Sequence, residues 1–374
     1  MITIHARNIR ALGHLVWPLH DVSVLTGPNG AGKTTVLFVL RALRAAFDRD
    51  ISTAIRTCFD GGYNLRTHGA TADANIELGV DVDDLRWRIR LVSILNGGYG
   101  TEETLTSGEH TIMWRDGLGS FSYRGEMQNV STIASEKLAV RLLAETFPDD
   151  AEVSSVAECL RNITVFMDPN LRSLRENGSR ITDNRHLRTD GLNVLTMLRT
   201  WRDRRADESR FRFVDQGLRS AFPGVYTSLD FADSGQTLSS TVYRDGLEVG
   251  TPLSHEANGL LAMMMLLTQI AAAEDGGVVA IDEPEHALHP FAIRTFVRLT
   301  RARAKQHRLS VILTTHSPVL LDAFQANPEQ IFVLEKGSSV HPVRLDQMRD
   351  REWLSRYTLG ELYVNGQFAT NEDS

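Results

Sequence analysis

One short segment near the start of the chain constrains the fold more than any other, because it fits the pattern G-x-x-x-x-G-K-[ST]. The apolar run 22–25 before it predicts a buried strand, and the run 35–40 after it predicts the start of a helix. Strand, glycine-rich loop and helix form the context in which this motif holds phosphate groups. The residues expected around the phosphates are Gly27, Pro28, Asn29, Gly30, Ala31, Gly32, Lys33, Thr34 and Thr35.

Each residue type in this loop suits a particular contact. Glycines let backbone N–H groups curve around a β-phosphate without Cβ clashes, and the N-terminus of the following helix favours negative charge. Lys33 is expected to reach the β- and γ-phosphates, and the Thr34 hydroxyl is placed to hold Mg²⁺. The alternative is a chance glycine-rich turn before a helix, and the motifs further along the chain argue against it.

A second group of polar residues follows the apolar run 278–281, which ends in Asp282 and Glu283. Carboxylates at the carboxyl end of a buried parallel strand face the ligand in α/β proteins. We expect Asp282 to hold Mg²⁺ through water, and Glu283 to act as general base on the attacking water. The alternative is a helix N-terminus that favours acidic residues for electrostatic reasons alone.

A further predicted strand, 309–313, leads into Thr314, Thr315 and His316. At the same sheet edge, a ring N–H of His316 could contact a γ-phosphate oxygen and report its presence or loss. A lone histidine at a strand end is otherwise a surface residue. The predicted catalytic residues are therefore Lys33, Glu283 and His316.

The overall composition limits the class of protein. A chain of 374 residues predicts about two domains, and its net charge of −7 argues against a uniformly basic nucleic-acid binder. Cys58 and Cys159 have no metal-ligand spacing, which favours a reduced, cytoplasmic compartment. The apolar stretch 260–273 is too short to span a bilayer and predicts a buried helix. We expect no association with a membrane.

Positive charge is concentrated in two places. Residues 161–219 contain thirteen arginines and no lysine, against eight acidic residues. They could contact nucleic-acid phosphates, or they could form ion-paired helix surfaces. A predicted helix over 290–305 carries a basic stripe on one face, which suits DNA, RNA or another anionic partner, or simply solvent. The stripe consists of Arg294, Arg298, Arg301 and Lys305.

The local patterns predict the domain organisation. Residues 1–26 are expected to form two strands separated by a turn near Gly13 and His14, and residues 74–92 a hairpin. Two final strands are expected within 330–345. The predicted units are 1–130, with the phosphate loop and a β subdomain; 131–220, an inserted helical segment; and 221–374, which carries the remaining motifs.

The order of these motifs resembles one family. The phosphate loop, D-E-P-E-x-x-L-H-P at 282–290 and T-T-H-S-P at 314–318 together resemble the ABC-type ATPases of the RecF/SMC/OLD group, bacterial proteins also described as AAA family ATPases. The resemblance implies an α/β fold, an ABC-type P-loop NTPase head with an antiparallel β subdomain and an inserted helical lid. It also implies ATP and Mg²⁺ as cofactors. Two such heads dimerise, with each nucleotide between the phosphate loop of one head and the signature segment of the other.

The segment 253–261 matches that signature, with Asn258 and Gly259 at a helix N-terminus aimed at the partner's γ-phosphate. Two departures from the family pattern predict slow, switch-like hydrolysis. Ala257 stands where the family has serine. The glutamine of the Q-loop has no clear match, and Gln128 is the one candidate. The sequence does not decide which residue stacks on the adenine, for which Trp17 and Phe38 are candidates.

The resemblance also suggests a biological role. Segments 168–172, 189–195 and 353–363 look like those of compact family members encoded in bacterial phage-defence operons. OLD-type relatives carry a C-terminal Toprim nuclease, whereas only 56 residues follow Pro318 here, so we expect a separate nuclease or toxin as effector. The favoured hypothesis is an ATP-dependent, dimeric switch that controls an effector or a DNA transaction. The alternative is a scaffold that binds ATP but hydrolyses it poorly. A transporter subunit is disfavoured because no LSGGQ-like string is present.

Overall fold

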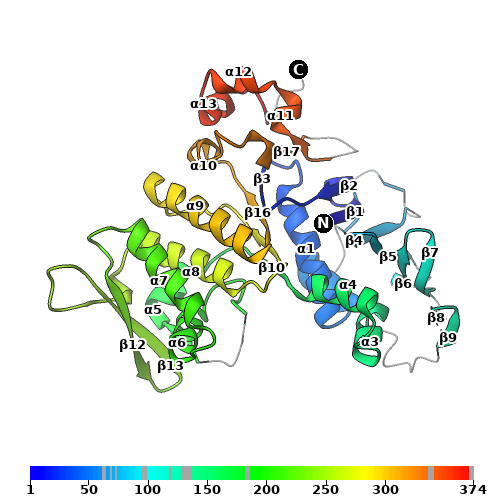
Figure 1. Cartoon of the computed structure of the whole chain (residues 1–374), viewed down its shortest axis with the longest axis horizontal. Coiled ribbons are helices and arrows are strands. Elements are labelled where there is room, and N and C mark those ends of the chain that lie inside the picture. Colours follow the sequence, from blue (N-terminus) through cyan, green and yellow to red (C-terminus); the bar gives the residue numbers. More distant parts are fainter. Residues whose placement is uncertain are drawn as a thin grey trace.

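The chain folds around a mostly parallel central sheet, with an antiparallel sheet on one side and a helical lobe on the other (Figure 1). The structure is a computed structural model that describes residues 1–60, 65–67, 70–71, 74–93, 99–117, 120–128, 137–181, 186–335 and 341–369. This arrangement confirms the predicted α/β class with an antiparallel β subdomain.

The central sheet has six strands in the order β10-β15-β16-β3-β17-β18, and only β18 is antiparallel to its neighbour. Along β15, Val278 and Ala280 face one core and Val279 and Ile281 face the other. Burial on both faces explains why these strands read as continuous apolar runs. The strands are β3 (Val22–Thr26), β10 (Ile163–Phe166), β15 (Val278–Ile281), β16 (Ser310–Thr314), β17 (Ile331–Val333) and β18 (Val343–Arg344).

Helices cover both faces of this sheet. Helix α1 (Lys33–Asp48) belongs to the first core, and α8 (Asn258–Ala272) and α9 (Pro290–His307) belong to the second. All residues of α8 from Leu260 onward are buried, which confirms the predicted buried helix. Among the described residues, none of the helices combines the length and the apolar character needed to cross a membrane.

The antiparallel sheet has the strand order β2-β1-β4-β5-β6-β7-β8-β9 and confirms the hairpin predicted at 74–92. The turn predicted near Gly13 and His14 is wrong, because both residues lie inside β2 and the chain reverses at Arg10 and Ala11. Burial of Leu12, Leu15 and Trp17 holds that strand in the core. The strands are β1 (Ile2–Ile9), β2 (Leu12–Pro18), β4 (Ile76–Val82), β5 (Leu85–Ser93), β6 (Tyr99–Ser107), β7 (His110–Arg115), β8 (Phe121–Tyr123) and β9 (Glu126–Gln128).

The described part of the segment 131–220 contributes to two places in the fold. Its first two helices, α3 (Ala139–Thr146) and α4 (Ala151–Arg161), pack into the core beside the antiparallel sheet, and β10 then joins the central sheet. Only α5 (Leu171–Asn177), α6 (Val194–Asp203) and α7 (Glu208–Ala221) enter the helical lobe, beside α8 and α9 (Figure 1). The three domain boundaries stay a prediction.

The remaining elements are short. A small sheet in the helical lobe contains β11 (Ser179–Arg180), β12 (Ser228–Ser234), β13 (Thr237–Tyr243) and β14 (Thr251–Pro252). Helix α2 (Ile51–Cys58) follows α1. The C-terminal helices, drawn in orange and red at the top of Figure 1, are α10 (Pro318–Asp322), α11 (Leu345–Met348), α12 (Arg351–Ser355) and α13 (Leu359–Val364). Strands β17 and β18 confirm the two strands expected within 330–345.

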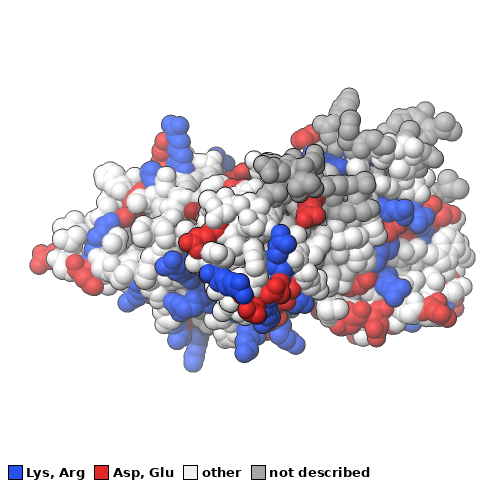
Figure 2. Space-filling model, turned by 90° about the horizontal axis from the view of Figure 1, so that it is seen from above, with Lys and Arg blue, Asp and Glu red and all other residues white. Residues whose placement is uncertain are grey.

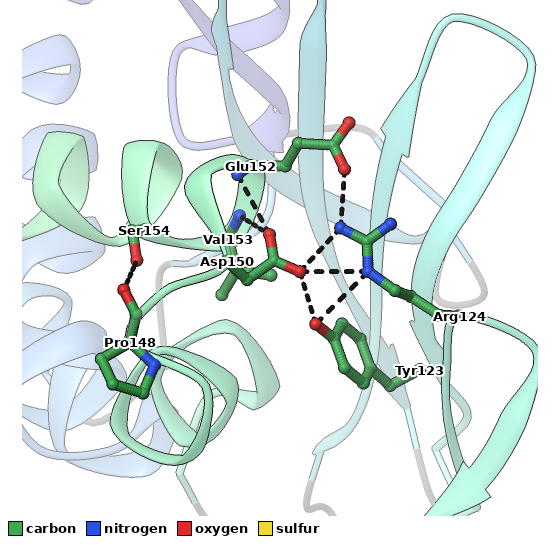
Figure 3. Close-up of polar contacts among 7 residues, drawn as sticks. All are labelled: Tyr123, Arg124, Pro148, Asp150, Glu152, Val153 and Ser154. Atoms are coloured by element: carbon green, nitrogen blue, oxygen red, sulfur yellow. Dashed lines mark hydrogen bonds and ion pairs between the residues drawn. The ribbon is translucent and has the colours of Figure 1, made fainter.

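A polar cluster joins the end of the antiparallel sheet to α4 (Figure 3). Asp150 caps this helix by accepting hydrogen bonds from the backbone N–H groups of Glu152 and Val153, at 3.0 and 3.1 Å. The same carboxylate accepts from the Tyr123 hydroxyl and from Arg124, whose guanidinium also contacts Glu152 at 2.8 Å. One carboxylate therefore fixes both the start of α4 and the hairpin formed by β8 and β9.

A second carboxylate, Glu103 on β6, joins the same sheet to α3. It is 1% exposed and accepts hydrogen bonds from the N–H groups of Ala139 and Val140 and from the Trp87 indole, at 2.6, 2.9 and 2.9 Å. Burial raises the pKa of Glu103, while these donors and the helix N-terminus oppose that change. The sheet and the helix are thus held together by one satisfied, buried side chain.

We expect Glu103→Ala to lower the free energy of unfolding by about 2–4 kcal/mol, because three buried donors lose their acceptor. Urea unfolding followed by circular dichroism measures this change. The matched control is Glu102→Ala, at the preceding residue of the strand, whose side chain is 40% exposed and paired with Arg90. That control should cost less than about 1 kcal/mol, and equal losses in the two variants would contradict the role of Glu103.

Candidate nucleotide-binding site

Three neighbouring parallel strands end at one edge of the central sheet and bring the predicted site residues there. The strands β15, β16 and β3 are adjacent, with Ile281 opposite Leu313 and Thr314 opposite Leu25. The segments that follow them carry Asp282 and Glu283, His316, and the phosphate loop. Residues separated by almost 300 positions in the sequence therefore share one site, as parallel α/β sheets arrange their ligand contacts.

The phosphate loop has a backbone that requires glycine. Gly27, Gly30 and Gly32 adopt positive φ values of 153°, 81° and 110°. A Cβ atom on Gly27 would lie 2.2 Å from the carbonyl oxygen of Leu334, at the end of β17, so no other residue fits there. Helix α1 begins at Lys33, and its N-terminus faces the loop as the sequence predicts. Thr34 is exposed and Thr35 is buried.

The Lys33 side chain folds back over the loop. Its ammonium group donates hydrogen bonds to the carbonyl oxygens of Gly27 and Pro28, at 2.8 and 3.1 Å. Burial lowers the pKa of Lys33 to about 8, although the nearby carboxylates of Glu283 and Asp282 favour its charged form. The ammonium group is thus a buried cation whose hydrogen bonds go to two backbone carbonyl oxygens of the loop.

The acidic residues are held by the neighbouring strand. The Thr314 hydroxyl donates to the Asp282 carboxylate and accepts from the Glu283 N–H at 3.1 Å. Burial raises the pKa of Asp282, and the negative charges of Glu283 and Asp168 raise it further. A bound cation would relieve this electrostatic cost. Glu283 also contacts the exposed His286 ring at 2.9 Å, a contact that the sequence did not predict.

His316 is positioned by two groups. Its backbone N–H donates to the Glu285 carboxylate at 3.2 Å, and the same oxygen accepts from the Thr315 hydroxyl at 2.6 Å. Its ring nitrogen Nδ1 lies 3.0 Å from the Tyr363 hydroxyl, which comes from α13. Burial, with a smaller contribution from Lys33, lowers the pKa of His316, so the imidazole is neutral near pH 7.

A third carboxylate lies at this edge. Asp168 follows β10, the strand next to β15, and adopts a left-handed φ of 53°. It lines a cavity of about 470 Å³ together with Asp282, Glu283 and His286. Gln128, by contrast, lies in β9 at the outer edge of the antiparallel sheet. The sequence could not identify Asp168, because β10 lies in a segment of otherwise helical composition.

The signature segment is tied down by two arginines from other elements. Helix α8 begins at Asn258 with Ala257 as its N-cap, which places Asn258 and Gly259 in the first helical turn, as predicted. Arg175 of α5 donates to the Asn258 side chain and, at 2.8 Å, to the Glu256 carbonyl oxygen. Arg244 makes two hydrogen bonds of 2.8 Å to the buried Glu256 carboxylate. No sequence motif indicated either arginine.

The two candidates for adenine stacking differ in their surroundings. The Trp17 ring is buried and packs edge-on against Phe332, at 5.3 Å between ring centres. It is therefore part of the core. The Phe38 ring, on α1, is half-buried and faces the Arg10 guanidinium at 4.9 Å.

The arginine-rich segment 161–219 consists largely of paired side chains in the part that the structure describes. Seven of its arginines form ion pairs with acidic residues nearby in the sequence or on a neighbouring element, which favours the interpretation as ion-paired surfaces. They are Arg172, Arg188, Arg199, Arg202, Arg210, Arg212 and Arg219.

The predicted basic stripe on α9 is only partly correct. Arg294, Arg298 and Lys305 are exposed. Arg301 instead turns inward, donates to the Gln330 side chain at 2.7 Å, and lies 4.2 Å from the centre of the Phe324 ring. Burial lowers its pKa. The helical spacing placed Arg301 on the correct side of α9, but residues from the segment after α10 cover that part of the helix.

A glycine-rich loop before a helix, with two carboxylates and a histidine at the same edge of a parallel sheet, defines the class of P-loop nucleoside triphosphatases. The AAA_21 family, described as "AAA domain, putative AbiEii toxin, Type IV TA system", matches residues 162–322. That part runs from the residue before β10 to the end of α10, and it includes the signature segment, the acidic residues and His316.

Comparisons with known proteins found one relative in sequence and several similar folds. The chain is 25% identical to an OLD nuclease of Thermus scotoductus over 350 residues, which cover 85% of this chain and 59% of the nuclease. A similar fold is that of an Smc head bound to the C-winged helix domain of ScpA. The alignment covers 93% of this chain and 99% of the Smc chain, with a TM-score of 0.51 and 11% identity.

Another is an Smc head domain bound to the C-terminal domain of ScpA derived from Pyrococcus furiosus. That alignment covers 96% of this chain and 100% of the other chain, with a TM-score of 0.49 and 11% identity. The fold, the family match and the OLD relative support an ABC-type AAA ATPase related to the RecF, SMC and OLD proteins.

We expect nucleotide binding to depend on the charge of Lys33. Phosphate groups favour its protonated form, so ATP·Mg²⁺ should bind with uptake of a proton around pH 8 and should bind more weakly at higher pH, by up to about tenfold per pH unit. Isothermal titration calorimetry between pH 7.5 and 9.5, in two buffers with different ionisation enthalpies, measures both effects.

The matched control is Lys33→Arg, whose guanidinium stays charged over this whole range. Any ATP binding by that variant should show no proton uptake. An affinity of the unaltered protein that does not change between pH 7.5 and 9.5 would contradict a phosphate-binding Lys33 whose pKa is lowered to about 8.

Proposed function

We propose that the chain is an ATP-dependent switch that binds ATP·Mg²⁺, hydrolyses it slowly and dimerises around the nucleotide. The observation that carries the proposal is the convergence of the phosphate loop, Asp282–Glu283 and His316 at one sheet edge. The residues from Gly27 to Thr35 cradle the phosphates. Glu283 acts as general base, and His316 contacts the γ-phosphate.

The residues present fit a magnesium ion. The Thr34 hydroxyl and the Asp282 carboxylate are hard oxygen donors of the type that Mg²⁺ prefers, together with phosphate oxygens. The buried Asp282, with two further carboxylates nearby, is in an environment that a divalent cation would stabilise. When bound, the ion would neutralise charge on the transferred phosphoryl group.

Dimerisation is proposed to complete each site in trans. The N-terminus of α8, with Asn258 and Gly259, would approach the γ-phosphate held by the partner head. Ala257 offers no hydroxyl for that phosphate, which supports slow turnover. We further propose that dimerisation and hydrolysis change the conformation of the protein, and that this change controls a separate nuclease or toxin in anti-phage defence. The OLD nuclease match and the toxin–antitoxin description of the matched family support this role.

The main test uses Glu283→Gln. Turnover of ATP should fall by at least about 100-fold, because the general base is lost, while ATP binding persists. Released phosphate measures turnover, and light scattering measures the mass in solution. In the presence of ATP·Mg²⁺ the mass of the variant should double, because the sandwiched nucleotide is not hydrolysed.

The matched control is Glu352→Gln, which alters an 81%-exposed side chain on α12 and should leave turnover unchanged. Equal turnover in the unaltered protein and in Glu283→Gln would favour the alternative, a hydrolysis-poor scaffold that holds its effector. A mass that stays constant with ATP·Mg²⁺ would contradict nucleotide-driven dimerisation.

A second function, binding of DNA or RNA, is favoured by the exposed side of α9. Arg294, Arg298 and Lys305 are exposed and, within the described ranges, form no ion pair. Their spacings of four and seven residues place them along one side of the helix. Lys and Arg side chains also gather toward one side of the molecule in Figure 2, with acidic side chains among them. In contrast, the arginines of α6 and α7 are mostly paired.

We expect Arg294→Glu combined with Arg298→Glu to weaken binding of a duplex oligonucleotide by at least about tenfold. The slope of the logarithm of the binding constant against the logarithm of the salt concentration should also fall, by the amount that corresponds to about two phosphate contacts. Fluorescence anisotropy at several salt concentrations measures both. The control is Arg212→Glu, an exposed arginine already paired with Glu208. Equal effects of the double variant and this control would argue against a specific nucleic-acid surface on α9.

A further inference from the structure

The last helix of the described chain packs directly beside the histidine of the site. Helix α13 lies on α10, which begins two residues after His316. The Gly360 N–H donates to Asp322 and the Leu359 N–H donates to Gln325, each at 2.7 Å. A Cβ atom on Gly360 would lie 2.7 Å from the Pro318 carbonyl oxygen, so the two backbones are in close contact. The helix is thus fixed relative to the site.

From this helix, the Tyr363 side chain reaches two strand ends at once. Its hydroxyl lies 3.0 Å from Nδ1 of His316, after β16. It also lies beside the hydroxyl of Thr26, the last residue of β3 and the one before Gly27. The Thr26 hydroxyl is fully buried and makes no hydrogen bond of ordinary geometry among the residues that the structure describes. A buried hydroxyl needs a partner, and the phenol is the group placed to supply it.

The protonation states leave two ways to share the protons of this contact. Burial raises the pKa of Tyr363, so the phenol keeps its proton, and the lowered pKa of His316 leaves its ring with one N–H. Either the phenol donates to Nδ1 and the ring proton is on Nε2, or Nδ1–H donates to the phenol oxygen. Only the first arrangement leaves a ring N–H on the side of the imidazole away from Tyr363. The charged groups that act on the ring are Lys33, Glu283 and Asp282, and Glu285 binds its backbone N–H.

We propose that Tyr363 is a positioning residue that selects the Nε2–H tautomer of His316 and fixes the ring so that this N–H faces the γ-phosphate. The inference rests on the proposed function and deepens it, because it assigns to α13 a part in hydrolysis. Tyr363 then connects the end of β3, directly before the phosphate loop, with the γ-phosphate contact of His316. A merely structural tyrosine would fill space in the same place but would not set the tautomer.

The test is Tyr363→Phe, which keeps the ring and its contact with Phe368 and removes only the hydroxyl. We expect kcat to fall about tenfold while the Kd for ATP·Mg²⁺ changes less than about twofold, because the contact acts on the transition state. The acid limb of the kcat profile should move to higher pH, since loss of the donor to Nδ1 makes the imidazole easier to protonate. Thermal unfolding verifies that the variant is folded.

The matched control is Tyr357→Phe, in the same tail but 57% exposed, which should change neither kcat nor its pH profile. In a His316→Ala background, Tyr363→Phe should have no further effect, because it acts only through the imidazole. A further tenfold loss in that background, or a Tyr363→Phe enzyme with the unaltered kcat and pH profile, would overturn the proposal.

A spectroscopic measurement tests the tautomer without turnover. With ¹⁵N-labelled histidine, the His316 ring signals should show protonated Nε2 in the unaltered protein and a mixture of tautomers in Tyr363→Phe. Identical ring signals in both proteins would overturn the tautomer assignment alone. Turnover of the unaltered protein no higher than that of Glu283→Gln would overturn the proposed hydrolysis, and with it this role of Tyr363.

Discussion

The parallel pairing of β15, β16 and β3 is the constraint on which the site depends. Each strand is buried on both faces, so its register is set by the packing of α1 on one side and of α8 and α9 on the other. Because the three strands run in the same direction, their carboxyl ends deliver a cation, two carboxylates and an imidazole to one edge. A change of register by one residue would exchange the two cores and move these groups away from each other.

Most of this arrangement could be predicted from local sequence, because each component is a short motif attached to a strand. The loop from Gly27 to Thr34 and the acids after β15 carry their own context of strand and turn. The strands β2 and β10 could not be predicted in this way. Gly13 suggested a turn inside β2, and β10 has only four residues between helical segments, so pairing with β15, more than 100 positions away, decides its structure.

Contacts between distant residues account for the rest. Arg175 reaches Asn258 and Tyr363 reaches His316 across long sequence separations. Arg175 belongs to no motif, and the segment 353–363 indicated a family resemblance but not the contact that Tyr363 makes. For Arg301 the sequence predicted exposure that the structure does not have. Helical spacing placed this residue on an exposed face, whereas Phe324 and Gln330 hold its side chain inside. Spacing predicts which residues share a helix face, but only tertiary packing decides how far that face is covered.

The contact between Tyr363 and the end of β3 also has a consequence for synthesis of the protein. The phosphate loop leaves the ribosome among the first residues, whereas α13 follows more than 300 residues later. Chains are made at roughly 5–20 residues per second, so the two sides of this contact exist apart for many seconds. The nascent chain therefore carries its phosphate loop long before His316 can be oriented, and the site matures only when the last helix docks.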